Sequence, residues 1–184
     1  MLRKLGVGVS VAALALMFAS TASATTFPIG TVPQFYITSG TPFSNSITAN
    51  FGNGFNSQVN FDDSFTFTIP TKDGVGSGSI STSFSSPGNH LVINQLWVNG
   101  TLYAVPATSS GQSLTLNGVP ITHGVLNTIR VVGVSGPEGG SYAGTATFAA
   151  TAVPEAGTWA MMLGGFGLMG VVMRRRQSKL AYAA

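Results

Sequence analysis

The chain has 184 residues, no cysteine and a formal net charge of +3 from eight basic and five acidic residues. Six of the basic residues lie near the two termini, so residues 25–153 carry only two basic against four acidic side chains, a balance of −2. The absence of cysteine excludes disulfides and thiol chemistry, and the middle of the chain lacks the basic surface that nucleic-acid binding requires. We therefore expect one small domain between two terminal segments.

The first 24 residues have the three parts of a secretory signal peptide. Arg3 and Lys4 form a positive start, residues 7–19 are apolar, and Ala22 and Ala24 are the small residues of a cleavage site. We expect export through the Sec translocon and cleavage by signal peptidase after Ala24. The mature domain is then expected to cover residues 25–152, with a separate C-terminal segment at 153–184.

The clearest strand of the predicted domain covers residues 61–69. Phe61 and Phe65 share one face with further apolar residues, and hydroxyl side chains occupy the other face. Asp63 breaks the pattern because it has the parity of the phenylalanines. Either the strand begins only at Ser64, or Asp63 lies at its mouth and binds backbone amides.

Two Asn-Gly pairs, Asn99-Gly100 and Asn117-Gly118, each separate two apolar runs. Such a pair is a strong hairpin signal because both residues tolerate the positive φ of a type I′ turn. Glycines at 52–54 and 74–78 predict a loop or bulge and a loop, respectively. No helical pattern of useful length occurs between residues 25 and 152. We expect an all-β domain, an antiparallel, jelly-roll-like β-sandwich of about eight to ten strands.

The candidate acids and bases give a weak case for an enzyme. His90 and His123 have no carboxylate nearby in the sequence, which favours solvated turn histidines over a catalytic base. Asp62 and Asp63 are adjacent, so on a strand they point to opposite faces and cannot form the carboxylate pair of a glycosidase. A calcium site formed by Asp62, Asp63 and Asp73 is an alternative, although no EF-hand spacing is present. We assign no catalytic residue, no metal and no cofactor.

Aromatic residues offer a second functional hypothesis, the binding of carbohydrate. Exposed rings can stack on sugars, whereas an aromatic residue in a strand usually belongs to the core. Two or more rings exposed on one sheet face would favour a lectin-like module, and full burial would exclude it. The candidates are Tyr36, Trp97, Tyr103 and Tyr142.

The C-terminal segment has the pattern of a membrane stop. Residues 161–173 carry no charge, Trp159 precedes them, and Arg174, Arg175 and Arg176 follow. The apolar stretch from 156 to 173 has 18 residues, near the lower limit for a spanning helix of ~20. We expect a transmembrane helix that anchors weakly and is later removed.

This segment resembles the C-terminal sorting signal of the PEP-CTERM proteins of Gram-negative bacteria, in the variant Pro-Glu-Pro-x-x-Trp-Ala. The motif positions are Pro154, Glu155, Trp159 and Ala160, and Ala156 replaces the second proline. The resemblance implies export, transient anchoring in the inner membrane and recognition by a protease-transpeptidase called an exosortase. The product would reach the cell surface or an extracellular polysaccharide matrix. The alternative is an ordinary C-terminal membrane anchor.

The strand at residues 61–69 carries a second resemblance. Phe61, Asp63 and Phe65, followed by Thr-Phe-Thr-Ile-Pro, are similar to the pattern that names the FxDxF group of PEP-CTERM proteins. This resemblance implies a location and no chemistry. The sequence thus predicts an exported, non-enzymatic protein of the cell surface or of the exopolysaccharide and biofilm matrix, without nucleic-acid partners. The alternative is a carbohydrate-binding module held at the membrane.

Overall fold

The computed structural model describes residues 23–108, 110–151 and 156–180. Within these residues the chain forms eleven strands and one helix, α1 (Ala156–Leu180). The strands are β1 (Ser23–Pro28), β2 (Phe35–Ser39), β3 (Ser46–Phe55), β4 (Asn60–Phe67), β5 (Gly74–Thr82), β6 (Leu91–Val98), β7 (Thr101–Tyr103), β8 (Ala107–Thr108), β9 (Gly111–Ile121), β10 (Asn127–Ser135) and β11 (Gly140–Ala150). Most of the predicted signal peptide lies outside the described residues.

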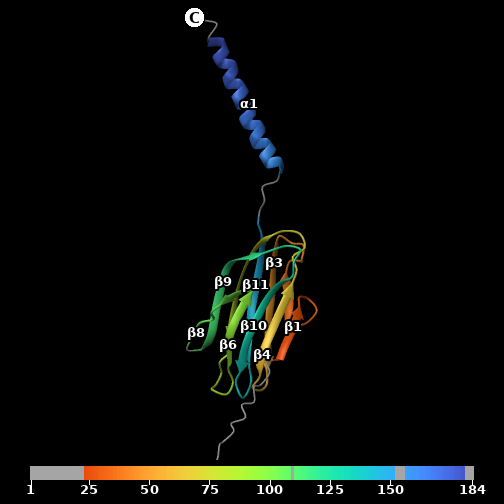
Figure 1. Cartoon of the computed structure of the whole chain (residues 1–184), viewed down its shortest axis with the longest axis vertical. Helices are drawn as coiled ribbons and strands as arrows, with labels where there is room; N and C mark the ends of the chain where they lie inside the picture. Colours follow the sequence, from red (N-terminus) through yellow and green to blue (C-terminus); the bar gives the residue numbers. More distant parts are fainter. Residues whose placement is uncertain (1–22, 109, 152–155, 181–184) are drawn as a thin grey trace, which may run out of the picture.

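The strands form two sheets that pack face to face. One sheet has the order β1-β4-β10-β6-β7 and the other has the order β2-β3-β11-β5-β9-β8. Their strands run along the long axis of the domain (Figure 1). The pairs are antiparallel except for β1 with β4, which is parallel. These two antiparallel-rich sheets agree with the predicted sandwich, while the jelly-roll description remains a prediction.

Strand β4 has the predicted alternation and supplies the centre of the core. Phe61 and Phe65 are 1% and 0% exposed. The ring of Phe65 contacts Phe27, Phe51 and further aromatic rings from both sheets. A fully buried phenylalanine contributes about 1.5–3 kcal/mol of hydrophobic free energy, so this cluster is a main source of adhesion between the sheets.

The two Asn-Gly pairs have different structures. Asn99 and Gly100 form the predicted hairpin between β6 and β7, with φ angles of 48° and 82°. The prediction of a hairpin at Asn117-Gly118 is wrong, because both residues lie inside the continuous strand β9. Gly118 has φ of 71° where the pairing with β5 shifts register. A bulge formed around a glycine in the left-handed region requires the same positive φ as a tight turn, so the sequence signal is the same for both.

The glycine-rich segments predicted as loops lie within strands instead. Gly52 is in β3, and Gly74, Gly76 and Gly78 are in β5. A Cβ on Gly74 would lie 2.3 Å from the carbonyl oxygen of Ala149 and 2.4 Å from the Phe148 ring. Glycine occurs in these strands because neighbouring strands of the sheet approach closely, and this tertiary requirement overrides the low strand propensity of glycine.

Candidate functional site

The C-terminal tail forms α1, which contains Trp159, Ala160 and Arg174. The side chains described along it are exposed, with Trp159 53% exposed. Pro154 and Glu155 lie outside the described residues, and Arg175 and Arg176 belong to the helix by their backbone. The helix predicted for the apolar tail is therefore present, whereas the placement of the Pro-Glu motif is not tested.

The length and hydropathy of α1 bear on its predicted transmembrane character. Among the residues that the structure describes, no helix is sufficiently long and apolar to pass through a membrane. Several glycines and the arginines lower the mean hydropathy of α1. The predicted transmembrane helix is therefore not confirmed.

The tail leaves the domain from the middle of the six-stranded sheet. Ala150 ends β11, and its N–H donates to the carbonyl oxygen of Asn45 at 2.8 Å. The N–H of Thr151 donates to the carbonyl oxygen of Asp73 at 3.0 Å. The chain is therefore held by two loops up to Thr151, immediately before the tail begins.

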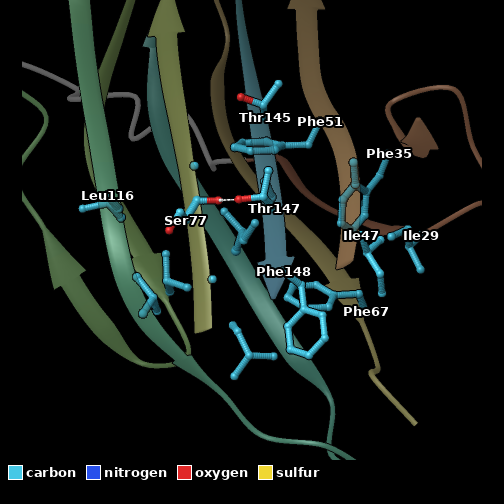
Figure 2. A pocket seen from close by; sticks show the side chains of 18 of the residues that line it. Ile29, Phe35, Ile47, Phe51, Phe67, Ser77, Leu116, Thr145, Thr147 and Phe148 are labelled. Atoms are coloured by element: carbon cyan, nitrogen blue, oxygen red, sulfur yellow. Dashed lines mark hydrogen bonds between the residues drawn. The ribbon is translucent and has the colours of Figure 1, made fainter. Parts of the chain in front are cut away.

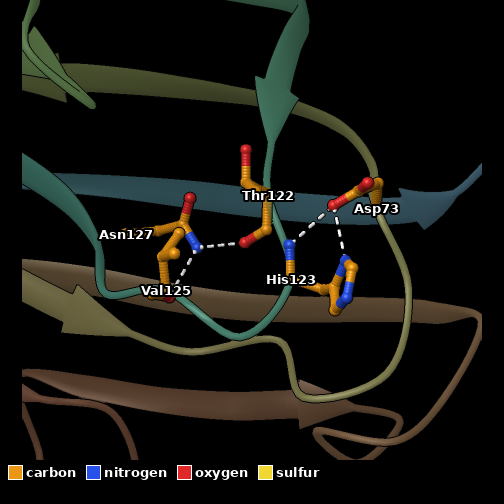
Figure 3. A network of polar contacts seen from close by, with 5 residues as sticks. All are labelled: Asp73, Thr122, His123, Val125 and Asn127. Carbon is orange, nitrogen blue, oxygen red and sulfur yellow. Dashed lines mark hydrogen bonds and ion pairs between the residues drawn. The ribbon is translucent and has the colours of Figure 1, made fainter.

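A histidine–carboxylate pair lies beside this exit point (Figure 3). Oδ1 of Asp73 accepts the backbone N–H of His123 at 2.8 Å and also lies 2.8 Å from its ring Nδ1. The hydrogen bond from the backbone N–H, followed by that from the ring, holds the pKa of Asp73 below its usual value. No sequence pattern predicts this contact, because 50 residues separate the two side chains.

The Asp73–His123 pair does not have the surroundings of a catalytic dyad. The side chains of Asp73 and His123 are 62% and 50% exposed, and neither residue lines the cavity between the sheets or the pocket beside the β6–β7 hairpin. A catalytic base requires a nucleophile and a recess that holds the substrate. The pair therefore joins the β4–β5 and β9–β10 loops and supplies no assigned chemistry.

Asp63 lies in the middle of β4 and points between the sheets. It is 1% exposed, and its Oδ2 accepts from the Tyr142 hydroxyl at 2.6 Å and from Nδ2 of Asn53 at 2.9 Å. Burial raises the pKa of Asp63, and burial also raises the pKa of Tyr142. The expectation of a late strand start, or of bonds to backbone amides at the strand mouth, is wrong. The partners are side chains on β3 and β11, which sequence spacing does not reveal.

Asp62 points to the opposite face of β4, as predicted for adjacent strand residues. It accepts two hydrogen bonds from Arg130 on β10, at 2.7 Å from Nε and 2.6 Å from Nη2. The hydrogen bond from Arg130 lowers the pKa of Asp62. The aspartates considered for calcium thus have separate partners, and the described residues contain no cluster of three or more His, Asp or Glu side chains that could hold a metal.

The aromatic side chains considered for sugar binding do not form a platform. Tyr142 is 2% exposed, and Tyr103 packs against the core. Tyr36 is 46% exposed on the six-stranded sheet. Trp97 is half-buried on the five-stranded sheet, opposite Arg130, and its Nε1–H donates to Oε1 of Gln95. Tyr103 is also half-buried and lies on the same sheet as Trp97, but it is paired with the buried Leu96 and therefore faces the core side. Since no two of these four rings are exposed on one sheet face, the arrangement that would favour a lectin-like module is absent among them.

A cavity of about 90 Å³ lies between the sheets (Figure 2). It follows a row of paired residues across five strands of the six-stranded sheet: Ile37, Ala49, Ala146, Gly78 and Leu116. Three adjacent positions in the middle of this row have small side chains or none. The opposite wall is apolar, with Leu96, Val98 and Ile129. The cavity is therefore a gap in core packing that sequence alternation alone did not predict.

Comparisons with known proteins locate one functional feature. No curated protein sequence matches the chain. A solved structure of PliG from Aeromonas hydrophila, a periplasmic inhibitor of g-type lysozyme, is similar over 70% of this chain and 99% of that chain, with 12% identity and a TM-score of 0.32. This likeness is too low to support an argument. Residues 152–177 match the model of the PEP-CTERM protein-sorting motif, so this chain is a protein that carries a PEP-CTERM sorting tag.

Proposed function

We propose that the chain is an exported, non-enzymatic protein of the cell surface or of the exopolysaccharide and biofilm matrix. The observation that carries this proposal is the sorting motif at residues 152–177, which begins directly after the last strand of the β-domain. Such a motif implies exosortase-dependent export to the cell envelope or surface. The matrix destination and the non-enzymatic role are our extension of that statement.

The β-domain supports a structural role by the way its polar groups are used. Tyr142 and Asn53 donate to the buried carboxylate of Asp63, and Arg130 donates to the half-buried carboxylate of Asp62. Buried and active-site groups with shifted pKa values indicate catalysis only when they converge in a cleft. These groups point to opposite faces of β4, and each one connects strands. The FxDxF pattern can thus be explained by the packing of Phe61 and Phe65 and by the contacts of Asp63 with β3 and β11. That the chain belongs to the FxDxF group remains a proposal.

The processing scheme we propose has two cuts. Signal peptidase removes residues 1–24 after Sec-dependent export, and the exosortase acts on the tag that contains Pro154, Glu155, Trp159 and Ala160. A first cut after Ala24 would remove two residues of β1, which begins at Ser23, and leave Thr25–Pro28 to pair with β4. The tag associates transiently with the inner membrane, with Arg174 to Arg176 on the cytoplasmic side.

Intact-mass measurement on the full chain tests this proposal. The protein is expressed in a Gram-negative host that has an exosortase and in the same host without it, and medium and membrane fractions are compared. We expect a form that begins at Thr25 and lacks α1, present only with the exosortase. A matched tag variant, Glu155→Ala, should accumulate unprocessed. Full-length C-termini in the membranes of both hosts would instead indicate an ordinary anchor and overturn the proposal.

The carbohydrate-binding alternative requires a separate measurement because Trp97 is the accessible ring on its sheet face. Stacking of a sugar on Trp97 would quench or shift indole fluorescence during titration with exopolysaccharide fragments. Trp159 also fluoresces, so the titration compares the whole chain with its Trp97→Phe variant. A saturable change that disappears in this variant would favour the lectin-like function over a purely structural one.

A further inference from the structure

The end of the sandwich from which the tail leaves has an unusual surface. The register places the starts of β3 and β5 and the end of β9 beside the end of β11, through the pairs Ala149 with Ser46, Ala150 with Gly74, and Gly74 with Ile121. The β2–β3, β4–β5 and β9–β10 loops therefore surround the exit of the tail. We call these three loops the exit end.

The exit end carries the most exposed large apolar side chains of the described β-domain. Phe43 in the β2–β3 loop is 70% exposed, and Leu126 in the β9–β10 loop is 67% exposed, next to Val125 at 49%. Exposing large apolar side chains to water is unfavourable, and several of them at one end of a domain are typical of an interaction site. The opposite end of the sandwich has one such side chain in the β5–β6 segment, Phe84, at 49%.

The loops at the exit end are held in place by hydrogen bonds. Nζ of Lys72 donates to Oδ1 of Asn45 at 2.9 Å, which links the β4–β5 and β2–β3 loops. The contacts between Asp73 and His123 link the β4–β5 and β9–β10 loops. Nδ2 of Asn127, which is 1% exposed, donates to the carbonyl oxygens within the β9–β10 loop (Figure 3). The exposed apolar side chains are thus presented by a preorganised surface, which reduces the entropy lost on binding.

The short covalent connection between the domain and the tag determines which molecule comes into contact with the exit end. Thr151 is hydrogen-bonded to Asp73, and Pro154 is only three residues further along the chain. Three residues span at most about 11 Å when fully extended. An interface of standard size covers ~800 Å² per partner, equivalent to a disc of roughly 16 Å radius. An enzyme that binds the Pro-Glu motif in its active site through an interface of this size would therefore also contact the exit end.

We propose that the exit end is a docking surface for the exosortase, with Phe43 and Leu126 as its apolar anchors. This inference rests on the proposed function, since it concerns the enzyme that reads the tag. The charges favour a protein partner over the lipid surface. The positive charge of Lys72 is balanced by the negative charge of the adjacent Asp73, whereas attraction to anionic lipid requires clusters of basic residues. Recognition would then include the folded domain as well as the linear motif.

Processing rates of surface variants test the proposal in the full chain. Phe43→Ser and Leu126→Ser, singly and together, are compared with Phe84→Ser, which makes the same kind of apolar-to-polar change at the opposite end. Pulse-labelling followed by intact-mass analysis gives the rate of tag removal. We expect the double variant to be processed at least about tenfold more slowly, the effect of a typical interface anchor, and Phe84→Ser to match the unaltered chain. Unchanged melting temperatures would show that the variants fold.

The outcomes separate this inference from the function on which it rests. If the unaltered chain is not processed, the proposed function fails. If it is processed and the double variant keeps its rate, docking is overturned and the linear tag is sufficient. The membrane alternative is tested in the host without exosortase: a double variant that leaves the membrane fraction there would show contact with lipid and also overturn docking to the enzyme. A ten-residue Gly-Ser insertion after Thr151 should slow processing if the surface and the motif bind together.

Discussion

Filling the cavity between the sheets should stabilise the domain, and Ala146→Val is the most direct change. Ala146 lies in the middle of the cavity-lining row, paired with Ala49 on one side and Gly78 on the other. Valine adds two carbon atoms and suits a strand. Each buried carbon contributes about 0.8 kcal/mol, so we expect a gain of about 1.5 kcal/mol. A cavity of about 90 Å³ costs on the order of 2 kcal/mol at 24 cal/mol per Å³, which limits what filling can recover.

The same strand provides a control for strand propensity. Ala143 lies on β11 with its side chain on the exposed face, so Ala143→Val makes the same chemical change without access to the cavity. Urea denaturation gives the free energy of unfolding of both variants. The melting temperature of Ala146→Val should rise by roughly 3–6 °C per kcal/mol gained. A loss of stability in Ala146→Val would show that the gap cannot accommodate two more carbon atoms, and equal gains in both variants would show that strand propensity is the cause. Either result would refute the packing argument.

Three further predictions concern single residues. Burial raises the pKa of Asp63, so its negative charge opposes folding at neutral pH, and this penalty decreases as the pH falls through the folded-state pKa. The variant Asp63→Asn should therefore gain most in free energy of unfolding at pH 7 and less near pH 4.5. Urea titrations at the two pH values measure this difference. Arg130→Ala should lower the free energy of unfolding by at most about 1 kcal/mol at pH 7, because the ion pair with Asp62 is partly exposed. Arg130 lowers the pKa of Asp62, so this loss should disappear as Asp62 becomes protonated below pH ~3.9. Gly118→Ala should cost about 1–2 kcal/mol in thermal unfolding, because φ is 71° there while no atom lies within 4 Å of the added Cβ.

Local sequence signals predicted the parts of the fold that depend on neighbouring residues. The alternation in β4 placed Phe61 and Phe65 in the core, and Asn99-Gly100 located a hairpin, because both signals act within a few residues. The same rules failed at Gly74 and Gly118. At Gly74 the choice of residue depends on the close approach of β11, and at Gly118 it depends on the shift of register between β9 and β5. Both partner strands are distant in the sequence.

The polar contacts of the candidate sites were beyond the reach of the sequence for a related reason. Tyr142 and Asp63 are 79 residues apart, and His123 and Asp73 are 50 residues apart. No periodicity connects such pairs, since only the strand order brings β4 beside β11 across the core. The tail is the opposite case: its motif is linear and was recognised from the sequence, although its predicted membrane span was not confirmed.

The position of β11 limits when the domain can fold if the chain is exported from its N-terminus, as proposed above. It is the last strand in the sequence, yet it lies between β3 and β5 in the interior of its sheet. The six-stranded sheet therefore cannot close until residue 150 has emerged from the export channel. At that moment the sorting motif, from residue 152 onward, is still inside or just behind the channel. On the proposed export route, the domain would therefore fold last of all the steps before the tag emerges, and the exosortase would act on a domain whose central strand has only just been inserted.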